Sequence, residues 1–179
     1  MSFPTLNIGD LIAKTPIVQG GMGVGISLSR LASAVANEGG IGVIAGAMIG
    51  MKEPDVAKNP IEANLRALRQ ELTKAREKTQ GIIGVNIMVA LTTFSQMVRT
   101  AIENRADIIF SGAGLPLEMP KHLLQACEEK KQEFKTTLVP IVSSARAATL
   151  IARKWLSRFD YLPDAFVVEG PKAGGHLGF

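Results

Sequence analysis

The chain has 179 residues, enough for one domain with a substantial core, and its content of 46% hydrophobic and 20% charged residues is ordinary for a globular protein. Twenty basic and 16 acidic residues give a net charge of +4, and no nucleic-acid motif accompanies the basic residues, so a nucleic-acid partner is not indicated. Cys127 is the only cysteine, which excludes an intrachain disulfide, and the N-terminus lacks the apolar core of a signal peptide. We therefore expect a cytoplasmic protein.

The first part of the chain predicts two strands with a helix between them. An apolar segment from Pro16 predicts a short strand, and residues 27–39 predict a helix with Ser27 as its N-cap. The following run of 12 residues, GIGVIAGAMIGM, carries a double GxxxG spacing. It is too short to cross a membrane, since a spanning helix needs about 20 residues. It predicts instead a buried strand from Ile41 and a glycine-rich loop.

A long charged helix is predicted next. Asn59 is its expected N-cap, Pro60 takes the first helical position, and Glu62 stands where a capping-box acid belongs. The opposite face of this helix is basic. Its expected buried stripe consists of Ile61, Leu65, Leu68, Leu72 and Ala75.

Four more strands are predicted, starting near residues 82, 106, 137 and 164, with helices between them. They are continuous apolar runs rather than alternating ones, which is typical of parallel strands that are covered by helices. No linker or shift in composition divides the chain, so we expect residues 1–179 to form part of a single domain.

Two parallel architectures are compatible with this order of elements. A doubly wound sheet would carry G-x-G-x-x-G after its first strand, but the turn here reads GGMGVGIS and does not fit. A (β/α)8 TIM barrel places its chemistry on the loops at the carboxyl ends of several strands, and this chain has glycine-rich or polar residues at each of those ends. We therefore predict a TIM barrel of which the chain holds about six strands, so that the barrel is incomplete.

Five segments in this order resemble one family. They are PIVQGGMG, GGIGVIAG, GVNIM, SGAGLP and EGPKAGGH, and they are similar to the flavin-dependent nitronate monooxygenases, formerly called 2-nitropropane dioxygenases. The related flavin-containing enoyl-acyl carrier protein reductases share most of these segments. The resemblance covers about residues 16–179 and implies a barrel with FMN across its C-terminal mouth. The chain then represents the N-terminal portion of a larger FMN-binding barrel.

The resemblance assigns cofactor contacts to the ends of the first and third strands and to the last loop. The backbone of residues 19–22 is expected to lie against the flavin ring, because glycine lets a backbone approach closely. Asn86 matches an asparagine that hydrogen-bonds the flavin, and its amide offers both donors and an acceptor. The cofactor-binding residues implied are Gln19, Gly20, Gly21, Met22, Asn86, Gly174 and Gly175.

His176 matches the family histidine of the AGGH segment, which lies over the flavin and serves the nitro substrate as base or hydrogen-bond partner. An imidazole can take or give a proton near neutral pH, which suits that role. His122 lacks such a setting and is expected to face solvent. The substrate pocket is expected to include Ser111, Gly112, Ala113, Gly114 and Glu169, and no metal site is expected.

The resemblance implies FMN-dependent oxidation of nitronates or nitroalkanes by O2 to carbonyl compounds with release of nitrite. Two alternatives remain open: a flavin-dependent enoyl-thioester reductase that uses NAD(P)H, and a catalytically inactive half-barrel. The insert from Ile49 to Gly81 matches neither enzyme pattern, so the substrate is left open. The partners expected are a small-molecule substrate and O2, with neither nucleic acid nor membrane, and the chain is a candidate homo-oligomer.

Overall fold

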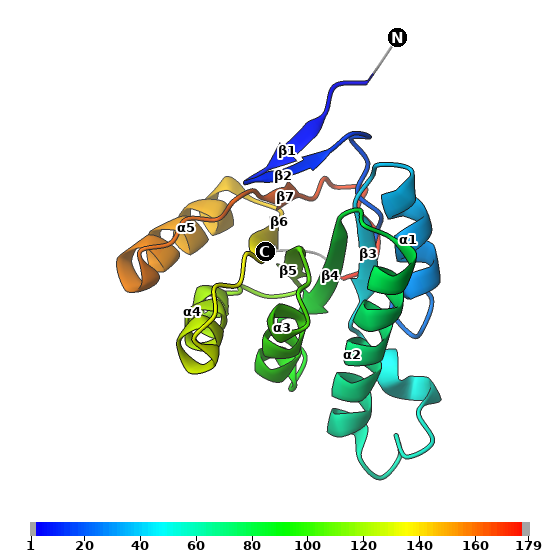
Figure 1. Cartoon of the computed structure of the whole chain (residues 1–179). Coiled ribbons are helices and arrows are strands. Elements are labelled where there is room, and N and C mark those ends of the chain that lie inside the picture. Colours follow the sequence, from blue (N-terminus) through cyan, green and yellow to red (C-terminus); the bar gives the residue numbers. More distant parts are fainter. Residues whose placement is uncertain (1–2, 177–179) are drawn as a thin grey trace.

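The computed structural model describes residues 3–176, in which five helices alternate with parallel strands (Figure 1). The helices are α1 (Ser29–Asn37), α2 (Pro60–Lys78), α3 (Phe94–Glu103), α4 (Met119–Lys130) and α5 (Ala145–Phe159), with a short 3-10 helix η1 (Ile49–Lys52) before α2. The strands are β1 (Leu6–Ile8), β2 (Leu11–Ala13), β3 (Gly42–Ala45), β4 (Ile83–Met88), β5 (Ile108–Gly112), β6 (Thr137–Val142) and β7 (Val167–Val168).

The main sheet consists of five parallel strands in the order β3-β4-β5-β6-β7. Asn86 pairs with Ala45 on one side and with Phe110 on the other, and Ser111 pairs with Pro140. All five helices lie on the outer face of this curved sheet (Figure 1). The arrangement is a half-barrel of parallel strands, which confirms the predicted class of an incomplete (β/α) barrel.

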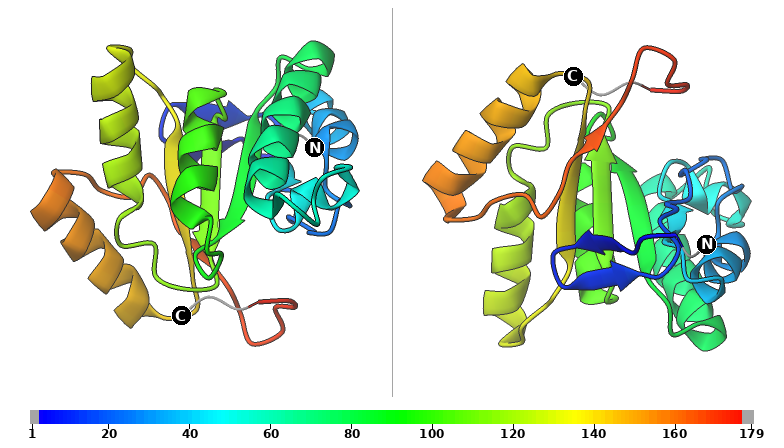
Figure 2. Two further views of the ribbon diagram at one scale, coloured as in Figure 1. Left: turned by 90° about the horizontal axis from the view of Figure 1, so that it is seen from below. Right: turned by 90° about the horizontal axis from the view of Figure 1, so that it is seen from above.

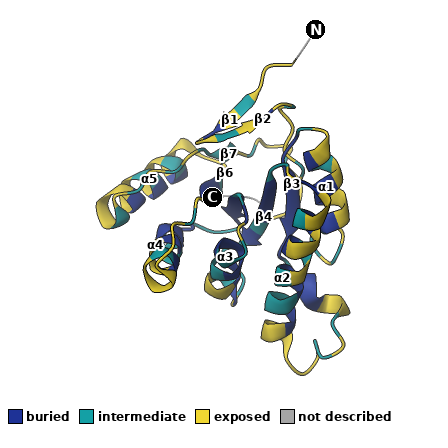
Figure 3. Cartoon of the chain, viewed as in Figure 1, coloured by how far each residue is buried: buried dark blue, intermediate teal, exposed yellow. Residues whose placement is uncertain are grey.

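Two separate apolar clusters cover the two faces of the sheet. The larger lies between strands β3 to β6 and the inward faces of the helices, which are buried (Figure 3). The smaller lies on the inner, concave face, and its buried members are Ile8, Ala13, Ile41, Val43, Ile108, Phe110 and Val139. Residues that alternate along one strand therefore serve different layers: Ile44 faces the helices and its neighbour Val43 faces the interior.

The inner cluster is covered by the antiparallel hairpin β1–β2, which the sequence did not predict. Leu6 pairs with Ala13 and Ile8 with Leu11, and the hairpin crosses the concave face of the sheet (Figure 2, right). Ile8 and Ala13 are buried, whereas Ile12 is exposed. The hairpin thus contributes one apolar side to the interior of the half-barrel.

The strand predicted from Pro16 is much shorter in the structure. Only one parallel bridge forms, between Val18 and Ile41, so this segment lies against the free edge of β3 without becoming a regular strand. Its backbone still follows strand geometry there, since Ile41 donates to the carbonyl of Ile17 and Gln19 donates to that of Ile41. The prediction of six strands therefore corresponds to five strands and one bridge.

Three expectations about helix ends were wrong or only partly right. Helix α1 begins at Ser29 with Leu28 in the N-cap position, so Ser27 is not its cap. Helix α2 begins at Pro60 as predicted, but the Asn59 side chain makes no capping hydrogen bond. Ile61 was assigned to the buried stripe of α2 and is 47% exposed, because the buried side begins instead at Ala63.

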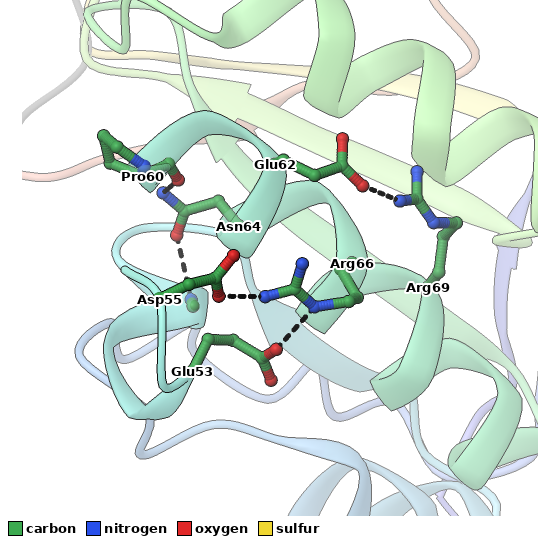
Figure 4. Close-up of polar contacts among 8 residues, drawn as sticks. Glu53, Asp55, Pro60, Glu62, Asn64, Arg66 and Arg69 are labelled. Carbon is green, nitrogen blue, oxygen red and sulfur yellow. Dashed lines mark hydrogen bonds and ion pairs between the residues drawn. The ribbon is translucent and has the colours of Figure 1, made fainter. Parts of the chain in front are cut away.

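The insert between β3 and β4 forms η1, a short turn region and α2, which are joined by polar contacts (Figure 4). The Asn64 side chain accepts a hydrogen bond from the Gly50 backbone at 2.8 Å. The Arg66 guanidinium pairs with both Glu53 and Asp55. The Glu62 carboxylate pairs with Arg69 rather than closing a capping box. Among residues 3–176, no helix combines the length and the apolar character needed to cross a membrane.

Candidate functional site

The candidate site lies at the carboxyl ends of the parallel strands, where most of the predicted residues are found. Loop 19–27 runs beside the end of β3, and the loop after β7 leaves the same end of the sheet (Figure 2). In barrels of this kind these loops carry the chemistry.

Gly21 and Asn86 are in direct contact, although they lie 65 positions apart in the sequence. A Cβ on Gly21 would lie 2.6 Å from the Asn86 Cβ, closer than any real side chain permits. Asn86 is half-buried in the carboxyl half of β4, and its backbone carbonyl accepts a hydrogen bond from Gly46 at 2.9 Å. The predicted loop and the predicted asparagine are therefore brought together.

The amide group of Asn86 has no hydrogen-bond partner among residues 3–176. No buried side-chain nitrogen or oxygen in this part of the chain lacks a partner, so both amide atoms of the half-buried Asn86 reach the surface. An amide at a strand end that is open on its polar side can bind a ligand with both a donor and an acceptor. This is the strongest single indication of a binding site.

The carboxamide of Gln19, by contrast, is used inside the protein. Its Nε2 donates to the Val43 carbonyl at 2.9 Å, and its Oε1 accepts from the Val43 N–H at 3.3 Å. The side chain thus replaces a neighbouring strand at the edge of β3. Any contact of Gln19 with a cofactor must come from its backbone, as the resemblance proposed, and not from its amide.

The backbone of Gly20 and Gly21 is open. Neither N–H donates a hydrogen bond within the described part of the chain, and a Cβ on Gly20 would meet no atom within 4 Å. Ser27, which is fully buried, bonds to the backbone on both sides of Gly21: its Oγ accepts from the Met22 N–H at 3.0 Å and donates to the Gly20 carbonyl at 3.2 Å. Sequence reasoning assigned Ser27 to helix capping and missed this contact.

The end of β5 is a tight turn whose side chains are mostly occupied. Ser111 is fully buried, and its Oγ donates to the Ile87 carbonyl at 2.9 Å, so its hydroxyl serves the sheet. Gly112 accepts a hydrogen bond from the Val89 N–H at 2.8 Å. Ala113 and Gly114 both have positive φ, of 53° and 138°, which turns the chain toward α4. Of this group, Ala113 and Gly114 are the half-buried residues that approach the surface.

The last loop leaves β7 and carries the predicted catalytic residue. Glu169 is half-buried, and its N–H donates to the Val142 carbonyl at 2.8 Å, which fixes the start of the loop. A turn follows, closed by a hydrogen bond from Ala173 to Gly170 at 3.0 Å. Gly174, Gly175 and His176 are exposed. No described hydrogen bond joins His176 to Asn86 or to loop 19–27, so the role of the histidine stays a prediction.

Two charged or titratable groups lie near these strand ends. Glu71 of α2 accepts a hydrogen bond from the Ser29 N–H at 2.9 Å, so it caps α1 from a distant part of the sequence. His122 on α4 is half-buried and packs edge-on against Phe94 with ring centres 6.4 Å apart, which corrects its predicted solvent-facing position. Burial lowers the pKa of His122.

Metal ligands and cavities do not alter this picture. Residues 3–176 contain no group of three or more His, Cys, Asp or Glu side chains that could hold a metal ion. A hollow of about 500 Å³ lies between the hairpin and the loops at the amino ends of β3 and β4, and one of about 440 Å³ lies along α5. Neither is lined by Asn86 or by residues 20–22.

Comparison with known proteins gives a consistent family. The family model described as nitronate monooxygenase matches residues 6–179. A probable nitronate monooxygenase from Bacillus subtilis is 26% identical, with 91% of this chain and 48% of that protein covered. The (3aS,4S,5R,7aS)-5-hydroxy-7a-methyl-1-oxo-octahydro-1H-indene-4-carboxyl-CoA dehydrogenase of Mycobacterium tuberculosis is 29% identical, covering 91% of this chain and 38% of the relative.

Among solved structures, FabK from Thermotoga maritima is similar with a TM-score of 0.65 and 28% identity, covering 92% of this chain and 43% of that chain. The chain therefore spans less than half the length of each of these relatives.

Proposed function

The chain belongs to the nitronate monooxygenase family of flavin oxidoreductases, and from this premise we propose that it forms the substrate-facing part of an FMN site that oxidises nitronates or nitroalkanes with O2. The observation that carries the proposal is the open amide of Asn86 directly beneath Gly21. A binding surface made of bare backbone and one bifunctional amide suits a flat heteroaromatic ring with alternating donors and acceptors.

The residues present fit FMN on three counts. Gly20 presents its Cα face to open space, the N–H groups of Gly20 and Gly21 are unpaired within residues 3–176, and the Asn86 amide is free to bond. A side chain at Gly21 would fill the space over Asn86. When bound, FMN would supply the acceptance of electrons from substrate and their transfer to O2. The chain supplies orientation.

His176 is proposed to act on the substrate. Its imidazole can hold the negative nitro group by a hydrogen bond or take a proton from the neighbouring carbon. The glycines before it, Gly174 and Gly175, are exposed and leave room beside the ring. Glu169, anchored by its backbone to the end of β6, is proposed to line the same pocket.

The dehydrogenase relative favours a second candidate. Its name describes action on a carboxyl-CoA thioester. FabK, an enoyl-ACP reductase, has a similar sequence identity to this chain. An NAD(P)H-dependent flavin reductase of enoyl thioesters is therefore the alternative. An inactive half-barrel remains a third, since the chain spans less than half of these relatives.

The first experiment is a visible absorption spectrum of the purified chain with FMN added, followed by identification of the flavin released on denaturation. We expect FMN to bind at near-stoichiometric ratio and nitronate to be turned over with release of nitrite. His176→Ala should lower turnover by roughly 10²-fold or more while FMN stays bound, as expected for loss of a general base.

His122→Ala is the matched control, because His122 is the other histidine of the chain and packs against Phe94 from α4. It should leave turnover unchanged. Rapid anaerobic reduction of the bound FMN by NADH, without nitronate turnover, would favour the reductase instead. A folded chain that binds no FMN would contradict the proposal for this chain and favour the inactive half-barrel.

A further inference from the structure

Ser27 stands out among the buried residues because its N–H, its carbonyl and its hydroxyl are all hydrogen-bonded, the N–H and the hydroxyl within loop 19–27 and the carbonyl to β3. Its N–H donates to the Met22 carbonyl at 3.0 Å, and its carbonyl accepts from Ala45 at 2.9 Å. Its Oγ accepts from the Met22 N–H and donates to the Gly20 carbonyl. One fully buried residue thus connects the end of β3, through its backbone carbonyl, to both sides of Gly21, through its hydroxyl.

A second clamp holds the other end of the same loop. The Gln19 amide pairs with both the N–H and the carbonyl of Val43, so the chain is fixed to β3 just before Gly20. Between the two clamps, the Gly20 carbonyl and the Met22 N–H are hydrogen-bonded to the Ser27 hydroxyl. The N–H groups of Gly20 and Gly21 are left unpaired within residues 3–176. The clamps therefore select which backbone groups of the loop stay available.

We propose that Ser27 is a positioning residue that sets residues 20–22 in their cofactor-binding shape before the cofactor arrives. The inference rests on the proposed FMN site. A flexible glycine pair would otherwise have to be ordered on binding, and that ordering lowers affinity. By holding the Gly20 carbonyl and the Met22 N–H, the Ser27 hydroxyl keeps Gly21 over Asn86 with its own N–H exposed.

A purely structural role is the competing explanation, since Ser27 also lies two residues before α1. The two roles differ in what they predict for the folded protein without FMN. A structural residue changes the free energy of unfolding and leaves the loop as it was. A positioning residue changes the local opening of the loop and the affinity for FMN, even where global stability is restored.

The experiment compares Ser27→Ala with Ser33→Ala in the full chain. Ser33 is also buried, and its Oγ bonds only within α1, to the Arg30 carbonyl, so its loss matches the change in burial without touching the loop. NMR-detected hydrogen exchange of the Met22 amide is measured in FMN-free protein. The dissociation constant for FMN is measured by quenching of flavin fluorescence.

For Ser27→Ala we expect exchange at Met22 to accelerate by about tenfold or more, and the FMN dissociation constant to rise about tenfold. Ser33→Ala should change neither. Ser27→Thr retains the hydroxyl and should restore slow exchange at Met22 even if the added methyl lowers stability, which keeps the test informative should the alanine variant unfold.

The outcomes separate the inference from the proposed function. If wild type binds FMN and Ser27→Ala changes neither exchange nor affinity, the inference is overturned and the FMN site stands. If wild type binds no FMN, the proposed function fails and a cofactor-positioning role falls with it. Exchange at Met22 that still depended on Ser27 would then show only that Ser27 orders the loop, with no cofactor for the loop to bind.

Discussion

The two ends of the parallel sheet are held by different chemistry. At the amino ends of the strands, carboxylates accept hydrogen bonds from the backbone: Asp107 accepts from the Ile83 N–H at 2.7 Å, and Asp164 accepts from the Leu138 N–H at 3.1 Å. Toward the carboxyl ends, neutral side chains of loop 19–27 bond the backbone: Gln19, at the start of this loop, bonds Val43, and Ser27 bonds Met22 and Gly20. The first end fixes strand order, and the second leaves selected backbone groups open.

This difference indicates that the residues that stabilise the sheet lie at the amino ends of its strands and those that bind ligands lie at the carboxyl ends, as is usual in barrels. Each aspartate precedes one strand and accepts from a residue at the start of the strand before it: Asp107 bonds the first residue of β4, and Asp164 bonds the second residue of β6. At the carboxyl ends, the same kind of hydrogen bond would occupy the backbone N–H groups that a ligand needs. The comparison can be tested by equivalent substitutions at the two ends.

The largest effect is expected from Gly42→Ala at the amino end of β3. A Cβ there would lie 1.8 Å from the Ala32 carbonyl oxygen of α1, and backbone cannot move aside as a side chain can. We expect the free energy of unfolding to fall by about 3 kcal/mol or more, measured by urea denaturation. A fall of less than 1 kcal/mol, with α1 still packed, would show that this end is not rigid.

A smaller loss is expected from Asp107→Ala. The change leaves the N–H of the fully buried Ile83 without its acceptor and removes the partner of Arg76, which lies 2.6 Å away. We expect a loss of about 2 kcal/mol in the free energy of unfolding, mainly from the unsatisfied N–H, because the ion pair is partly exposed and adds little.

Asp107→Asn is the matched variant, since it keeps an oxygen acceptor and removes the charge. It should cost about 1 kcal/mol or less. Equal losses for the two variants would mean that the charge, and not the hydrogen bond to Ile83, holds this end of the sheet.

Glu71→Gln tests a carboxylate near the carboxyl ends of the strands, where it caps α1 at Ser29. Burial alone would raise the pKa of Glu71, but hydrogen bonds from Lys74 and Ser29 outweigh it and hold that pKa below its ordinary value of 4.5. A lowered pKa stabilises the fold above the unfolded-state pKa, and that contribution is lost as pH falls through the folded-state pKa.

We therefore expect Glu71→Gln to cost about 1 kcal/mol at pH 7 and progressively less as pH falls below 4.5, measured by urea denaturation across that range. Thr73→Val on the same helix, with an exposed side chain, should show no such dependence on pH. A cost for Glu71→Gln that does not change with pH would show that only its hydrogen bond matters.

The sequence predicted the strands well and the contacts between them poorly. Strands β3 to β6 coincide with continuous apolar runs because each is buried on both faces, and a run such as IIGVNIMV carries that signal locally. The pairing of Gly21 with Asn86 could be expected only as two residues at neighbouring strand ends. The family resemblance, more than periodicity, indicated that both belong to one site.

What sequence could not predict depends on distant partners. Glu71 caps a helix that begins 42 positions earlier, so no local pattern marks it, and Ser27 was assigned to that cap instead. The hairpin β1–β2 has strands of three residues, too short for a clear alternation, and is stabilised by the inner apolar cluster. Gln19 looks like a ligand residue by motif, while the fold uses its amide within the sheet.

The smallest effect on stability, and the sharpest test of the open end, is expected from Gly20→Ala. Its φ lies outside the left-handed region and a Cβ would meet no atom within 4 Å, so the free energy of unfolding should change by less than about 0.5 kcal/mol. If the flavin lies against this backbone, the added methyl occupies the space it needs, and FMN affinity should fall at least tenfold as measured by fluorescence quenching.

Gly21→Ala is the comparison, because its Cβ would collide with Asn86 and should lower both stability and FMN affinity. Of the two variants, only Gly20→Ala is expected to lower FMN affinity without lowering the free energy of unfolding. A Gly20→Ala chain with unchanged stability and unchanged FMN affinity would place the cofactor elsewhere than over residues 20–22. The open backbone between the clamps at Gln19 and Ser27 would then be a feature of the loop alone, and the contrast between the two ends of the sheet would lose its functional meaning.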